Sequence, residues 1–139
     1  TGSDFVINYT NTKDANDNGS YYPVKWTLTK KQKGATEVTT VVKEGSLAEI
    51  EGAFGTAVTY NAGANEINDE YTLSWAWAFE TGDTQEAKDK NNALDTLLGM
   101  YEYAADKTNV TDGTYKVADD TNTSLSFTLN ISVEQVLDK

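Results

Sequence analysis

The sequence contains no cysteine, histidine or arginine, and it has one proline and one methionine among its 139 residues. Without histidine or cysteine it cannot build a Ser-His-Asp or Cys-His catalytic site, a conventional zinc site or an iron–sulfur cluster. Its 11 basic residues are all lysines and are outnumbered by 22 acidic ones, which gives a net charge of -11. Phosphate-backbone binding therefore lacks its electrostatic component, and we expect no nucleic-acid partner.

Long apolar runs are also absent. The longest, from Trp75 to Phe79, is far below the roughly 20 residues that a membrane-spanning helix requires. We therefore expect no membrane span. The polar beginning of the chain and its wealth of threonine and asparagine are typical of an exported protein, so we expect a secreted, extracellular or cell-surface location. The length is that of one domain.

The dominant pattern is a period-two alternation of apolar and polar residues, which indicates strands with one buried face. It is clearest at 71–79 and 125–133, and it recurs at 24–28, after Pro23. We expect further strands at 5–10, 36–43, 57–61 and 114–118. The pattern predicts an all-β fold, an antiparallel β-sandwich of jelly-roll-like form.

Two short helices are expected in the connections. Ser46 and Glu49 form a Ser-x-x-Glu capping box that begins the first helix, and Gly55 is expected to end it. The second helix is expected at 84–98, with Asp83 as its cap and Gly99 as its stop.

Aromatic residues are the first candidates for a binding site. Trp26, Trp75, Trp77 and Phe79 fall on inward-facing positions, so we interpret them as core aromatics. A sugar-stacking platform is the alternative for the stripe on 71–79. Tyr101 and Tyr103 follow the second helix in a polar segment, and we expect them to be surface-binding aromatics or a cover for the sandwich edge.

One stretch is similar to the first half of a calcium loop. Asp14, Asn16 and Asn18 precede Gly19 with the required spacing, but Lys25 stands where a bidentate glutamate should be. An ordinary polar turn explains the same residues. Calcium is therefore a weak candidate, and we expect no other cofactor. The adjacent carboxylates in the sequence do not show the cross-cleft separation that a glycosidase needs, and we expect no enzyme.

The N-terminal strand stands apart from the rest of the sequence. Its residues Phe5, Val6, Ile7, Asn8 and Tyr9 alternate, and a polar loop at 11–20 separates them from the next strand. Such a strand can pair within its own sheet, or it can complete the sheet of a neighbouring subunit. The second arrangement is a head-to-tail contact that generates a filament. We accordingly divide the chain into a donor segment and loop at 1–20 and one sandwich domain at 21–139.

The strand Tyr-Thr-Leu-Ser-Trp-Ala-Trp-Ala-Phe-Glu at 71–80, followed by a polar helix and then Asp-Thr-Leu-Leu-Gly at 95–99, resembles a motif of the TasA/camelysin-type exported proteins. These carry a W-x-W-x-(F/Y)-E strand, a helical insertion and a D-T-x-L-G segment. The helix beginning at Ser46 and the closing strand at 131–136 also fit. The matching pieces cover about half the chain, and residues before them carry no matching signature.

The resemblance implies a jelly-roll-like sandwich, secretion, and assembly into biofilm-matrix fibres through the N-terminal strand. The metallopeptidase activity attributed to some members is not implied here, because the chain has no histidine. We expect an extracellular filament subunit whose partners are identical subunits and other matrix components. The alternative is a monomeric secreted module that binds carbohydrate or a surface.

Overall fold

The computed structural model describes residues 5–14, 17–32, 37–54, 69–118, 121–130 and 132. Its strands and helices follow one another as β1 (Ile7–Asn11), β2 (Asn18–Tyr21), β3 (Val24–Gln32), β4 (Val38–Gly45), α1 (Leu47–Phe54), β5 (Asp69–Trp77), α2 (Gln85–Tyr103), β6 (Thr111–Asp112) and β7 (Tyr115–Val117). Over these residues the fold is mostly β, as the alternation predicted, and it contains two antiparallel sheets and two helices.

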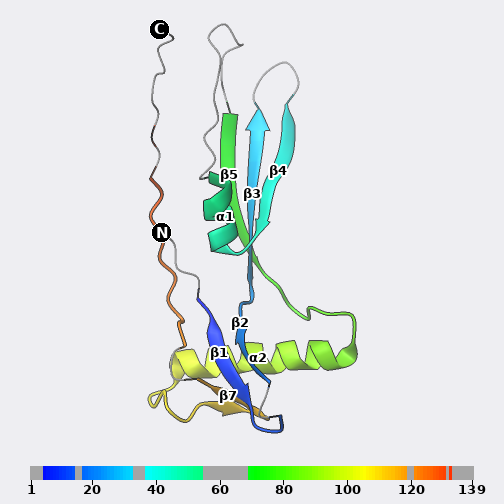
Figure 1. Ribbon diagram of the computed structural model, residues 1–139, viewed down its shortest axis with the longest axis vertical. Coiled ribbons are helices and arrows are strands. Elements are labelled where there is room, and N and C mark those ends of the chain that lie inside the picture. The colour runs from blue at the N-terminus through cyan, green and yellow to red at the C-terminus, as the bar shows by residue number, and fades with distance from the viewer. Residues whose placement is uncertain are drawn as a thin grey trace, which may run out of the picture.

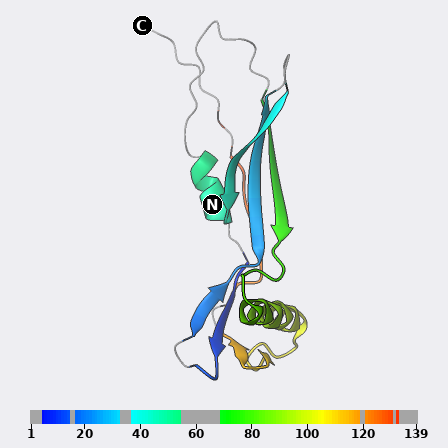
Figure 2. The same ribbon diagram turned by 90° about the vertical axis from the view of Figure 1, so that its right-hand side faces the viewer.

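The two sheets lie one above the other along the long axis of the molecule (Figure 1). One has the strand order β4-β3-β5 and the other the order β2-β1-β7-β6. The first carries α1 against one face, and α2 runs beneath it beside the second sheet, where Figure 2 shows it end-on. The jelly-roll connectivity remains a prediction, and the strand expected at 57–61 lies outside the described residues.

The first helix begins where the capping box predicted. The Ser46 amide donates to the Glu49 carboxylate at 2.9 Å, and the Glu49 amide donates to the Ser46 hydroxyl at 3.4 Å. The preceding Gly45 has a φ of 145°, and a Cβ there would lie 2.0 Å from a Glu49 carboxylate oxygen. Glycine is therefore required at this turn. The helix buries Leu47 and Ile50 in a core cluster with Val24, Trp26 and Leu28 of β3.

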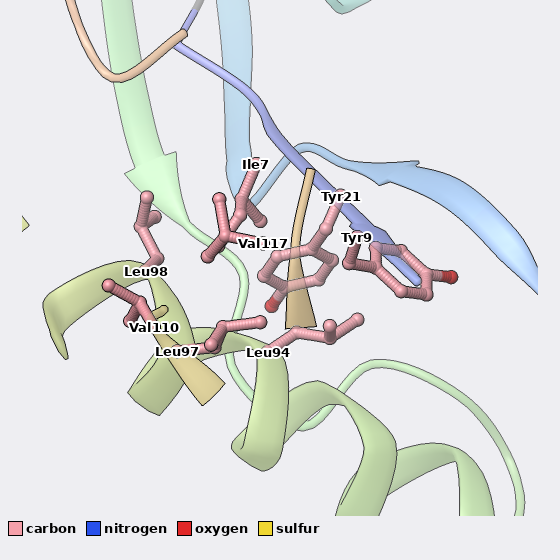
Figure 3. Close-up of a cluster of buried hydrophobic side chains, with 8 residues drawn as sticks. All are labelled: Ile7, Tyr9, Tyr21, Leu94, Leu97, Leu98, Val110 and Val117. Atoms are coloured by element: carbon pink, nitrogen blue, oxygen red, sulfur yellow. The ribbon is translucent and has the colours of Figure 1, made fainter. Parts of the chain in front are cut away.

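A second core cluster joins α2 to the other sheet (Figure 3). Leu94, Leu97 and Leu98 of α2 point at the β1, β2 and β7 side chains in this view. The helix is capped by Thr84, whose hydroxyl accepts the Ala87 amide at 3.2 Å, and not by Asp83. It also runs on to Tyr103, so the predicted stop at Gly99 was wrong. With 19 residues it is not short.

The C-terminal segment departs from its predicted strand. Residues 123–130 are extended but lie outside the named strands, although Val6 and Asn122 form a bridge just before them. Within this segment Leu125, Phe127 and Leu129 are exposed, while the Phe127 ring meets that of Trp26 edge-on, with 6.2 Å between centroids. In the described part of the chain, the apolar side chains of this alternating segment are thus exposed rather than buried in a sheet.

Candidate functional site

An open cleft of about 460 Å³ lies where the connection after β5 meets the C-terminal half of α2. Its volume is in the range of about 300–1,000 Å³ that is usual for ligand sites. Segments from both ends of the chain complete it. The lining consists of Phe5, Trp77, Phe79, Asp95, Leu98, Gly99, Glu102, Tyr103 and Thr123.

The Trp77 ring is held in place by a partly buried hydrogen bond to α2. Its indole N–H donates to the Asp95 Oδ1 atom at 3.0 Å, and the Tyr21 hydroxyl donates to the same oxygen at 2.9 Å. Burial and the neighbouring Asp95 both raise the pKa of Tyr21, so its hydroxyl keeps its proton as a donor. The carboxylate thus fixes the indole from one side and leaves the ring available to line the cleft.

Three neighbouring rings form one wall. The Phe5 and Trp77 centroids lie 5.7 Å apart with the planes tilted by 36°, and those of Trp77 and Phe79 lie 6.3 Å apart with a tilt of 32°. The cleft is therefore lined on this side by adjacent aromatic rings, of which Phe5 and Trp77 also pack against the core clusters. Phe79 is 71% exposed, and Tyr103, which also lines the cleft, is 91% exposed. Such a surface can stack against a flat ligand.

Gly99 does not end α2, and it contributes to the shape of the cleft. Glycine usually ends a helix, but Leu97 and Leu98 on one side and the half-buried Tyr101 on the other pack into the core and carry the helix through it. A Cβ at Gly99 would meet nothing within 4 Å. The glycine therefore leaves open space in the cleft wall, a role that local sequence rules did not reveal.

The two tyrosines that we expected to be surface-binding aromatics lie in different surroundings. Tyr103 lines the cleft. Tyr101 packs against the core cluster instead, and the Lys107 ammonium lies 4.6 Å from its ring centroid while bonding to the Tyr101 and Glu102 carbonyls. Lys107 thus neutralises the carbonyl end of the helix.

The four aromatic residues predicted to form the core also differ in their burial. Trp26 is buried, and the half-buried Trp77 packs against both core clusters. Trp75 is 63% exposed and Phe79 lies in the cleft, so their assignment to the core was wrong. The physical reason is position, because Trp75 lies on β5, at the edge of its sheet, whereas α1 packs against β3 and β4.

On the face of this sheet that carries Trp26 and Trp75, an exposed part lies next to a buried part. Trp75 lies directly opposite Trp26 across β5 and β3, so the two side chains share a face. The Trp26 indole N–H is buried, and it has no acceptor among the described residues. A buried donor without an acceptor costs about 1–3 kcal/mol. The face therefore has both the exposed apolar surface and the unmet hydrogen bond of an incomplete layer.

The predicted donor residues pair within their own chain in this structure. β1 lies between β2 and β7, and Ile7 is fully buried and Tyr9 nearly so in the cluster with α2. Asn8 accepts the Ala118 amide at 2.8 Å, and Val6 exchanges backbone bonds with Asn122. Phe5 lines the cleft. Whether the same positions are filled by a neighbour's strand in an assembly stays a prediction.

The calcium-like stretch holds an ion pair with an amine. Both oxygens of Asp17 lie 3.0 Å from the Lys90 ammonium, which also lies 5.2 Å from the Tyr9 ring centroid. Asn18 belongs to β2, Asp14 is exposed, and Asn16 lies outside the described residues. Within the described ranges no group of three or more acidic side chains could hold a metal ion.

Burial opposes the charge on Lys90, but hydrogen bonds to Tyr9 and Asp17 outweigh it and raise the Lys90 pKa to about 12. The same contact lowers the pKa of Asp17. The pair therefore stays charged across neutral pH and ties the β1–β2 connection to α2.

No family model, curated protein or solved structure matches this chain. In the described part of the chain, no helix is long and apolar enough to cross a membrane.

Proposed function

We propose that this protein is an extracellular structural subunit that polymerises into filaments, each subunit's N-terminal strand completing the fold of the next. The observation that carries the assembly into filaments is the incomplete layer around Trp26 and Trp75, where one indole is exposed and the other is a buried donor with no acceptor among the described residues. This layer lies in the β4-β3-β5 sheet and needs contact with another subunit, whereas the exchange of β1 concerns the other sheet. Exposed apolar faces on a chain of net charge -11 are typical of surfaces that another chain covers.

The buried position of β1 is compatible with exchange. In a swapped polymer the same strand fills the same place, but it comes from a neighbouring subunit. Ile7 and Tyr9 would then contact the neighbour's Leu94 and Leu97 through the interface that the single chain forms with itself. The residues between β1 and β2 would act as the hinge.

Electron microscopy of the purified protein tests whether filaments form. Because the chain has no native cysteine, a pair of engineered cysteines can then report which strand is exchanged. Thr10 of β1 lies opposite Lys116 of β7, so Thr10→Cys with Lys116→Cys places two thiols on neighbouring strands. A short bifunctional thiol reagent should give a ladder of covalent multimers from filaments.

The matched control is Thr27→Cys with Ser74→Cys, which lie opposite each other in the β4-β3-β5 sheet. This pair should cross-link only within one chain. Monomers from both pairs in intact filaments would exclude β1 as the exchanged strand. Absence of filaments under all salt conditions would overturn the proposal itself, and a monomeric surface-binding module would then be the better description.

A further inference from the structure

The cleft between β5 and α2 has a marked charge asymmetry. The two charged residues of its lining are Asp95 and Glu102, both acidic, and the chain carries a net charge of -11. An anionic ligand would be repelled by this field, whereas a cationic ligand would be attracted to it.

The aromatic wall adds a second requirement. Phe5, Trp77 and Phe79 line the cleft with adjacent aromatic rings, which suits a ligand that has apolar ring faces. A pyranose ring can stack on such a surface through its C–H bonds, and an ammonium group is attracted to the face of an aromatic ring. A ligand that combines sugar rings with amines satisfies both the wall and the charge.

The helix supplies a third observation. Gly99 lies within α2 and lines the cleft, and a Cβ at this position would meet no atom within 4 Å, so the absence of a side chain leaves space in the cleft. Glycine weakens a helix interior relative to alanine. Its presence is explained if the space is needed for a ligand.

From these observations we infer that the cleft binds a glycan with free amino groups, an oligomer or polymer of glucosamine-like sugars. The sugar rings stack on the wall formed by Phe5, Trp77 and Phe79. The amines lie near the Asp95 and Glu102 carboxylates. This inference goes beyond the proposed filament and does not require the chain to polymerise.

The direct test is calorimetric titration of the full chain with three hexasaccharides that share a β-1,4 linkage. Glucosamine hexamer should bind, whereas its fully N-acetylated form and cellohexaose should bind at least about tenfold more weakly, because they lack the charge. Added salt should weaken binding of the glucosamine hexamer. Equal binding of the cellohexaose would overturn the inference, as would the absence of binding by all three.

Two glycine substitutions locate the site. Gly99→Leu should fill the cleft and reduce affinity by at least about tenfold. Gly52→Leu is the matched control, because Gly52 lies in α1 and a Cβ there also meets nothing within 4 Å. Circular dichroism would verify that both variants fold. Unchanged affinity in Gly99→Leu would show that the ligand binds elsewhere and would overturn the assignment.

Glu102→Gln and Phe79→Ala separate charge from stacking. Glu102→Gln should reduce the salt dependence of binding, and Phe79→Ala should reduce affinity at all salt concentrations. If Gly99→Leu instead abolished filaments while no sugar bound the parent chain, the cleft would be a contact between copies of the chain and the inference would fail. Filament formation is scored separately, so this result is distinguishable from failure of the proposed function.

Discussion

Trp77 and Asp95 join the β4-β3-β5 sheet to α2, which packs on the other sheet. The indole N–H at the end of β5 donates to Asp95 of α2 at 3.0 Å, and Tyr21 of the other sheet donates to the same oxygen. Because one carboxylate serves both donors, its loss should affect this junction and the aromatic wall together.

Asp95→Ala should therefore lower the free energy of unfolding by about 3 kcal/mol, since hydrogen bonds to a charged group contribute about 1.5–3 kcal/mol each. Asp95→Asn keeps an oxygen acceptor and should lower it by only about 1 kcal/mol. Urea denaturation monitored by tryptophan fluorescence measures both. Equal losses in the two variants would show that the negative charge, rather than the acceptor, is what the two donors require.

The stability that Tyr21 contributes should be lost at alkaline pH. Burial and Asp95 raise its pKa above the ordinary value of 10.0, so the folded state holds the proton more tightly than the unfolded chain does. Its contribution is thus complete below pH about 10 and is lost as pH rises from there. Stability curves between pH 8 and 11 should fall less steeply in Tyr21→Phe. Identical slopes in the parent chain and Tyr21→Phe would contradict a raised pKa of Tyr21. The difference in stability between the two at pH 8, where the hydroxyl is protonated, measures the lost hydrogen bond alone.

Local features of the fold could be predicted from sequence, and features set by tertiary neighbours could not. The Ser46–Glu49 capping box depends on residues three apart, and the structure has it as predicted. The exposure of Trp75 depends on β5 being an edge strand, which alternation does not reveal. Asp95 meets Tyr21 across 74 positions of the chain, and no local pattern marks that contact.

Gly99 shows the same limit within one helix. Its tendency to end helices was outweighed by the packing of Leu97 and Leu98 on the core. Gly99→Ala and Gly52→Ala should each raise the free energy of unfolding by about 0.5–1 kcal/mol, because neither added methyl group meets a neighbour. Thermal and urea denaturation measure this gain. A loss of stability in Gly99→Ala alone would mean that the cleft closes around that position in solution.

Assembly should respond to ionic strength if the subunits polymerise. A net charge of -11 repels copies of the chain, and salt screens charges beyond about 8 Å at physiological strength. Light scattering and electron microscopy should show more and earlier filaments as sodium chloride increases. Sucrose at matched osmolality is the control for excluded-solute effects. Filament yield that is independent of salt would argue against an electrostatic barrier to assembly.

The Lys90–Asp17 pair should restrain the N-terminal strand. Lys90 holds both oxygens of Asp17 in the β1–β2 connection and lies over the Tyr9 ring, so it fixes the hinge that exchange requires. Lys90→Gln should raise the pKa of Asp17 toward its ordinary value of 3.8, because the ammonium is the first cause of the lowered pKa. The stability contributed by the depressed pKa is present above that value and is lost as pH falls through the folded-state pKa. Nuclear magnetic resonance titration of the Asp17 carboxyl measures the shift.

The same variant should exchange β1 and form filaments faster than the parent chain, whereas Lys88→Gln removes an equal charge from the same helix and should not. Equal rates in the two variants would mean that charge alone controls assembly and that the ion pair does not hold the strand.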